Sequence, residues 1–118
     1  MKIALKMGDA TLQSEKQEQA RILEHDILAS KGGDWEAKAR LSRAFMPLLV
    51  SLAKKRSDDN ATVNRYIEAG KNGVILAARK YKPSLGTERF QIFALDFIQK
   101  QMDRADPNRG FFARLFGR

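Results

Sequence analysis

The sequence predicts an all-α protein, a compact bundle of about four helices. Apolar side chains recur at helical spacing in four stretches, and no stretch shows the alternation of apolar and polar residues that is typical of strands. A chain of 118 residues also fits a single domain with a modest core. We divide it into residues 1–33, an N-terminal helix and connector, residues 34–105, the main helical domain, and residues 106–118, an aromatic and basic tail.

The first helix is expected from about Leu12 to Ala29. Ser14 and Gln17 have the spacing of a capping box, and the residues "KGGD" provide a stop. The apolar stripe of this helix is thin, so we expect it to be loosely attached to the rest of the domain.

The second helix is expected to follow Asp34, a favourable N-cap, and to continue to about Lys55. Pro47 lies inside this pattern. Because proline has no backbone N–H to donate, we expect a kink there. The apolar residues that share one face of this helix are Leu41, Ala44, Phe45, Leu48 and Leu52.

The third helix contains the stretch "RYIEAGKNGVILAARKY", with glycines at positions 70 and 73. Each interior glycine costs roughly 1 kcal/mol relative to alanine, so the pair needs a structural reason. Both glycines lie on or beside the apolar stripe that runs from Val63 to Tyr81. We therefore predict that they face inward and allow another helix to approach closely.

The fourth helix is expected from about Glu88 to Arg104, with Thr87 as its N-cap. Its apolar arc consists of Phe90, Phe93, Ala94, Phe97, Ile98 and Met102. Phe90 and Phe97 are central in this arc and are expected in the core. Phe93 lies at its edge, where the ring can turn inward or outward, and basic side chains are expected around it. The tail "FFARLFGR" is interpreted as a short helix packed on the domain or a disordered segment.

Composition excludes several classes of function. The chain has no cysteine and a single histidine, His25, so we expect no disulfide, metal site or cofactor. It has neither a phosphate-binding glycine loop nor a set of serine, histidine and carboxylate residues, so we expect no enzyme. No segment resembles a membrane span or a signal peptide, which predicts a cytoplasmic protein without membrane contact.

The positive charge is confined to one part of the chain. Residues 1–33 carry five basic and five acidic side chains, whereas residues 34–118 carry 17 basic and nine acidic ones, which accounts for the net charge of +8. Such asymmetry favours contact with nucleic acid over a role in solubility alone.

From about residue 37 to residue 104 the chain resembles region 2 of bacterial RNA polymerase sigma factors of the sigma-70 family. "ARLSRAFMPLLVSLAKKR" is similar to the first helix of that region. The later part carries an ordered series of matching residues: Gly70, Gly73, Ala77, Lys80, Tyr81, Gly86, Phe90, Ala94, Ile98 and Arg104.

The resemblance implies two working surfaces on an all-helical domain. In the family, the outward face of the glycine-bearing helix docks on the clamp helices of the polymerase, and the next helix opens the −10 element and holds flipped bases on aromatic rings. The docking candidates are Arg65, Glu68, Ala69, Asn72 and Leu76. The DNA-binding candidates are Lys80, Lys82, Arg89, Phe93, Asp96, Phe97, Lys100 and Arg104.

The sequence departs from the family on both surfaces. Arg65 stands at an acidic position of the docking helix, and Ala69 replaces a glutamate. On the next helix, Asp96 and Phe97 occupy the places of two tryptophans, and Lys100 that of a base-reading glutamine. An outward carboxylate at position 96 repels DNA, although an i,i+4 pair with Lys100 partly neutralises it.

Three hypotheses of function follow. The first is a stand-alone sigma-like protein that binds core RNA polymerase and −10-like promoter DNA. The second is a module that binds single-stranded or distorted DNA without polymerase. The third is a protein-interaction module that uses the sigma fold only as a docking surface. The sequence leaves the oligomeric state open.

Overall fold

The computed structural model describes residues 2–107, with side chains from residue 13 onward. This part of the chain has no strand, which confirms the all-α expectation, and most of the expected tail (residues 108–118) lies outside it. Its elements are α1 (Lys2–Lys31), α2 (Trp35–Ala44), α3 (Met46–Arg56), α4 (Asn60–Lys80), the 3-10 turns η1 (Pro83–Leu85) and η2 (Thr87–Arg89), and α5 (Phe90–Arg104).

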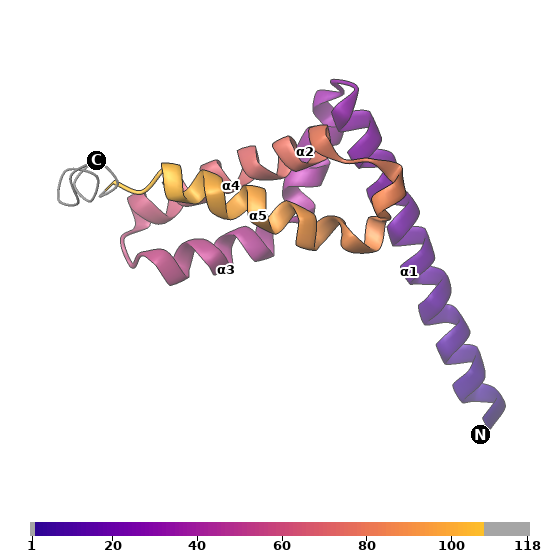
Figure 1. Cartoon of the computed structure of the whole chain (residues 1–118). Coiled ribbons are helices and arrows are strands. Elements are labelled where there is room, and N and C mark those ends of the chain that lie inside the picture. Colours follow the sequence, from indigo (N-terminus) through magenta and orange to yellow (C-terminus); the bar gives the residue numbers. More distant parts are fainter. Residues whose placement is uncertain (1, 108–118) are drawn as a thin grey trace.

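Helices α4 and α5 run antiparallel at the centre of the domain (Figure 1). Helix α3 packs along the first half of α4, and α1 and α2 pack at the opposite end, from which the first half of α1 projects away from the domain. The core lies between these helices, and its largest fully buried side chains are Tyr81, Phe90, Ile27, Leu41, Leu49, Ile98, Met102 and Val74.

Three aromatic rings join the separate helices at the α1 end of the domain. Phe90 is fully buried and makes edge-to-face contacts with Phe45 at 5.7 Å and with Tyr81 at 5.6 Å between ring centroids. Such edge-to-face pairs contribute about 0.5–1.5 kcal/mol each beyond the area they bury. Phe45 lies between α2 and α3 and Tyr81 follows α4, so this cluster ties the start of α5 to three other helices.

The two glycines of α4 face inward, as predicted. A Cβ atom added to Gly73 would lie 2.6 Å from the Cα atom of Ile98 and 2.8 Å from the carbonyl oxygen of Phe97, both in the backbone of α5. A Cβ atom on Gly70 would lie 2.7 Å from Leu49 Cδ2 and 3.0 Å from Met102 Cε, which are ends of side chains. Close approach of the helix backbones therefore depends on Gly73, and Gly70 makes room for packed side chains.

The expected kinked helix over residues 34–55 is two helices. Helix α2 ends at Ala44 and α3 begins at Met46, with Pro47 in its first turn. A proline in the first turn needs no backbone partner, whereas in a continuous helix its ring would collide with the carbonyl group four residues earlier. Asp34 caps α2 as predicted, because its carboxylate accepts hydrogen bonds from the N–H groups of Glu36 and Ala37.

Helix α1 begins at Lys2 and not near Leu12, so Ser14 and Gln17 lie inside a continuous helix and do not form its N-terminus. Residues 13–19 are all exposed, but the last part of the helix is firmly packed, contrary to the expected loose attachment. Ile27 is fully buried, the nearly buried Asp26 accepts a 3.1 Å hydrogen bond from Arg40, and Lys31 donates one of 2.8 Å to the carbonyl oxygen of Tyr81.

The start of α5 also differs from the expectation. Thr87 is part of η2 and is not the N-cap of α5. Helix α5 begins at Phe90, and its N-cap residue, Arg89, makes no side-chain capping hydrogen bond. Gly86 has a φ of 81°, a left-handed conformation that favours glycine, and this turn separates η1 from η2. Burial of Phe90 thus sets where α5 begins, in place of a polar cap.

No helix within residues 2–107 has a stretch long and apolar enough to cross a membrane.

Candidate nucleic-acid interface and docking face

One side of α5 carries both aromatic and basic residues. The helical repeat brings positions 89, 93, 97, 100 and 104 to the same side, because successive members are three or four residues apart. Arg89, Lys100 and Arg104 are exposed, and the two phenylalanines are half-buried. At 1.5 Å of rise per residue, the basic positions extend over about 22 Å. We call this surface, Arg89–Phe93–Phe97–Lys100–Arg104, the α5 track.

The rings of Phe93 and Phe97 form a partly open aromatic patch on this track. Their centroids are 5.1 Å apart, and Phe93 also contacts the buried Phe90 ring at 6.5 Å. Both half-buried rings pack against the core cluster. The expectation of a core position is therefore confirmed for Phe90 and only in part for Phe97, whose ring keeps some exposed surface.

The two carboxylates of the exposed face of α5 are paired with cations. Asp96 forms the predicted i,i+4 ion pair with Lys100, with 3.0 Å between the carboxylate and the ammonium nitrogen, and both side chains are exposed. Asp103 forms a 2.8 Å pair with Arg56 of α3, which also lies over the ring of Tyr66. Exposed pairs contribute little to stability, but they reduce the negative charge that DNA would meet.

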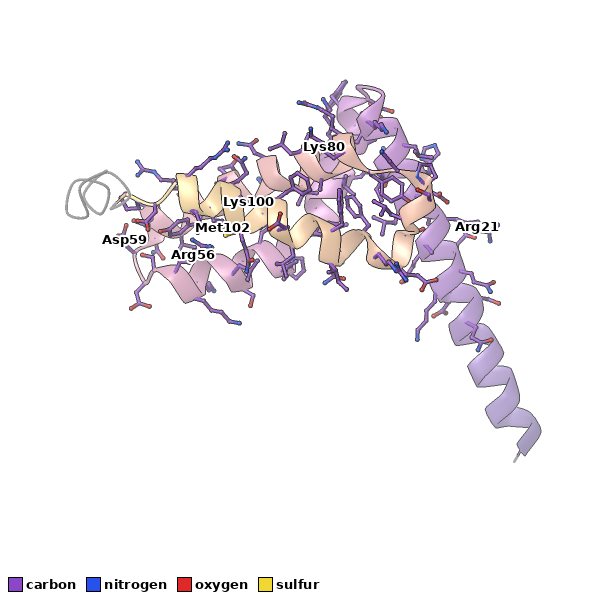
Figure 2. All side chains as sticks on the ribbon, in the orientation of Figure 1. Arg21, Arg56, Asp59, Lys80, Lys100 and Met102 are labelled. Atoms are coloured by element: carbon purple, nitrogen blue, oxygen red, sulfur yellow. The ribbon has the colours of Figure 1, made fainter. Side chains whose placement is uncertain are left out.

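Lys80 and Lys82 do not belong to the α5 track. Lys80 is the last residue of α4, beside α2, and Figure 2 shows Lys100 farther along α5 toward its C-terminal end. Lys82 lies in the turn after α4, and both side chains are exposed. The five cations that the sequence places around Phe93 therefore come from two parts of the fold. Three of them follow α5, and two lie at the end of α4.

Ile92, an apolar residue of α5 that is 74% exposed, was not among the residues predicted for this surface. It precedes Phe93 and shares a face with Asp96 and Asp103, on the side away from the core. Its position on the polar arc was readable from the helical repeat. Tyr66 was not among the predicted core residues either. It is buried on α4, beside the predicted apolar stripe.

The predicted docking residues share the outward face of α4. Arg65, Glu68 and Asn72 are exposed, whereas Ala69 and Leu76 are half-buried. Glu68 forms a 3.0 Å ion pair with Lys71, one turn further along the helix. Leu76 therefore has part of its side chain in contact with the domain and part available to a partner.

Asp59 is the one residue with a clear shift in pKa within the described part of the chain. It caps α4: the hydroxyl of Thr62 donates a 2.7 Å hydrogen bond and the Thr62 backbone N–H a 3.0 Å one to its carboxylate, and these bonds lower the pKa of Asp59. Figure 2 shows Asp59 at the end of the domain opposite Lys80.

The part of the chain that the structure describes contains no cluster of three or more His, Cys, Asp or Glu side chains that could hold a metal ion.

Comparison with known proteins agrees with the resemblance seen in the sequence. Over 79 residues the chain is 33% identical to RNA polymerase sigma factor SigA4 of Synechococcus elongatus, a match that covers 67% of this chain. The match spans only a quarter (25%) of the length of that protein. No family model and no solved structure matches the chain.

The sequence match and the all-helical domain support the same relationship. The chain is a sigma-70-like protein, homologous to part of a bacterial RNA polymerase sigma factor.

Proposed function

We propose that this protein acts in transcription initiation as a counterpart of sigma region 2, docking on core RNA polymerase through α4 and contacting −10-like promoter DNA through the α5 track. The observation that carries the proposal is the similarity to a protein named as an RNA polymerase sigma factor. The role is one of binding, without catalysis or a cofactor.

The chemistry of the α5 track supports contact with unpaired DNA. Base stacking on an aromatic ring contributes about 1–3 kcal/mol per base, which offsets a few kcal/mol for unstacking a step. Phe93 and Phe97 offer partly exposed rings, and Arg89, Lys100 and Arg104 are exposed cations at intervals along the same side. In this proposal the cations hold phosphates and fix the register, and the rings hold bases.

The packing of α4 against α5 supports a link between the two surfaces. Gly73 lies against the backbone of α5 at Phe97 and Ile98, so the two helices cannot slide past each other without losing this fit. A partner on the outward face of α4 would then hold the α5 track in a defined orientation toward promoter DNA.

The polymerase arm of the proposal is tested by co-purification of the full chain with purified core RNA polymerase, with and without a promoter fragment. The parent protein should be recovered with polymerase. Leu76→Asp should abolish recovery and leave the fold intact, because the half-buried side chain lies on the outward face. Ser51→Asp, at an exposed position of α3, is the matched control. Equal recovery of the parent and Leu76→Asp would refute docking through α4.

The DNA arm is tested by fluorescence anisotropy with single-stranded and bubble probes at two salt concentrations. Binding should weaken by roughly 0.7 log units per tenfold rise in salt for each phosphate contact. Lys100→Ala should weaken binding to all sequences alike, and Phe93→Ala should cost roughly 1–3 kcal/mol if the ring stacks on a base. Asp96→Trp should strengthen binding to opened promoter DNA. No binding at low salt would refute the DNA arm.

A second candidate is a module that binds single-stranded or distorted DNA without polymerase. The observation that favours it is the charge of the α4 face, where Arg65 stands at a position that is acidic in the family. In that case the anisotropy results would be as described above, but no polymerase would be recovered with the parent protein.

A further inference from the structure

The outward face of α4 carries two arginines that no carboxylate of the described residues neutralises. Arg65 and Arg79 are exposed and take part in no ion pair within residues 13–107. The carboxylate on this face, Glu68, is already paired with Lys71 at 3.0 Å. The face is therefore positive, and its positive charge comes from guanidinium groups that are free to bind a ligand.

The two arginines mark the ends of a regular seam. Positions 65, 69, 72, 76 and 79 follow one another at steps of four and three residues, the spacing with which one helix contacts another. Arg65 and Arg79 lie about 21 Å apart along the axis at 1.5 Å per residue. The half-buried Ala69 and Leu76 lie between them, on either side of the exposed Asn72. Apolar side chains between charged ends are the layout of many protein interfaces.

We propose that this face binds an acidic helical surface of a protein partner, in which carboxylates about 20 Å apart flank an apolar contact. The guanidinium fork of arginine matches a carboxylate with two parallel hydrogen bonds, which makes arginine well suited to this recognition. The aliphatic centre favours a protein over nucleic acid, since it offers no ring on which a base could stack. This inference rests on the proposed docking through α4 and specifies the chemistry of the partner.

The test uses two helical peptides held by side-chain staples, each with a leucine in the middle of one face. They differ only at two positions of that face, 14 residues apart, which are glutamate in one peptide and lysine in the other. Fluorescence anisotropy with the full chain at low ionic strength should show roughly tenfold tighter binding of the glutamate peptide. The double variant Arg65→Glu/Arg79→Glu should reverse this preference.

The matched control is Lys54→Glu/Lys55→Glu, which changes the net charge equally at two exposed positions of α3. It should keep the preference for the glutamate peptide. Circular dichroism checks the fold of each variant, and Arg65→Gln/Arg79→Gln, which should lose the preference, replaces the charge reversal if that variant unfolds.

Four results would overturn the inference: no binding of either peptide, equal binding of both, an equal effect of the two double variants, or displacement of the glutamate peptide by single-stranded DNA that itself depends on Arg65 and Arg79. The test uses no polymerase. A failure of the proposed function, in which polymerase is not recovered with the parent, is therefore distinguishable from a failure of this inference.

Discussion

Replacing Gly73 by alanine should loosen the contact between α4 and α5. The added Cβ atom would lie 2.6 Å from Ile98 Cα and 2.8 Å from Ile98 N, so α5 has to move away by several tenths of an ångström or more. Overpacking of this kind costs typically 1–3 kcal/mol, and here the upper half applies because backbone atoms cannot rotate away. Alanine recovers about 1 kcal/mol through its higher helix propensity. The expected net loss is about 1–2 kcal/mol.

Gly70→Ala is the matched control because it makes the same chemical change one turn earlier in α4. Its Cβ atom would meet Leu49 Cδ2 and Met102 Cε, which can move by rotation about side-chain bonds, so the gain in helix propensity should offset most of the cost. Urea unfolding followed by circular dichroism measures both variants. A Gly73→Ala protein at least as stable as Gly70→Ala would refute the backbone contact.

Three further predictions concern stability. Asp59→Ala should lower the urea midpoint more at pH 7 than at pH 3, because hydrogen bonds from Thr62 lower the pKa of Asp59 in the folded state, and the stabilisation is lost as pH falls through that pKa. Asp59→Asn, which can still cap the helix, is the control, and an equal effect of Asp59→Ala at both pH values would contradict the assignment. Tyr81→Phe should leave the free energy of unfolding unchanged or raise it by up to about 1 kcal/mol, because the buried hydroxyl has no hydrogen-bond partner among the described residues. A clear decrease in the free energy of unfolding, measured with urea, would show that the hydroxyl is hydrogen-bonded. Arg40→Ala should destabilise the protein by roughly 1–3 kcal/mol, because it leaves the nearly buried Asp26 carboxylate without its guanidinium partner. Arg43→Ala on the same helix is the control and should have a small effect. Equal thermal melts of the two variants would contradict this prediction.

The faces that α4 and α5 bury in the core were predictable from the sequence. The apolar arc of α5 and the inward glycines of α4 follow directly from the helical repeat, and the burial of Phe90, Ala94, Ile98 and Met102 confirms it. The ends of helices were less predictable. Thr87 and Ser14 have the chemistry of N-caps, but packing of Phe90 sets the start of α5, and the helix at residue 14 continues without interruption.

The candidate surfaces were predictable only where one helix carries the whole set. Phe93, Lys100 and Arg104 share α5, and Arg89 directly precedes it, so their common side follows from spacing alone. Lys80 and Lys82 belong to the end of α4 and the turn after it, and their position relative to Phe93 depends on how α4 and α5 cross. No periodicity within one helix encodes that crossing.

The contact at Gly73 explains why the sequence keeps two glycines inside a helix that otherwise consists of good helix formers. Without Gly73 the backbones of α4 and α5 would separate, and the α5 track would shift relative to the outward face of α4. The propensity cost of glycine, roughly 1 kcal/mol per residue, is smaller than the cost of overpacking this contact, which lies in the upper half of the usual range of about 1–3 kcal/mol. Glycine is therefore the more stable choice at position 73, and the geometry that it permits is the one on which the proposed link between docking and DNA contact depends.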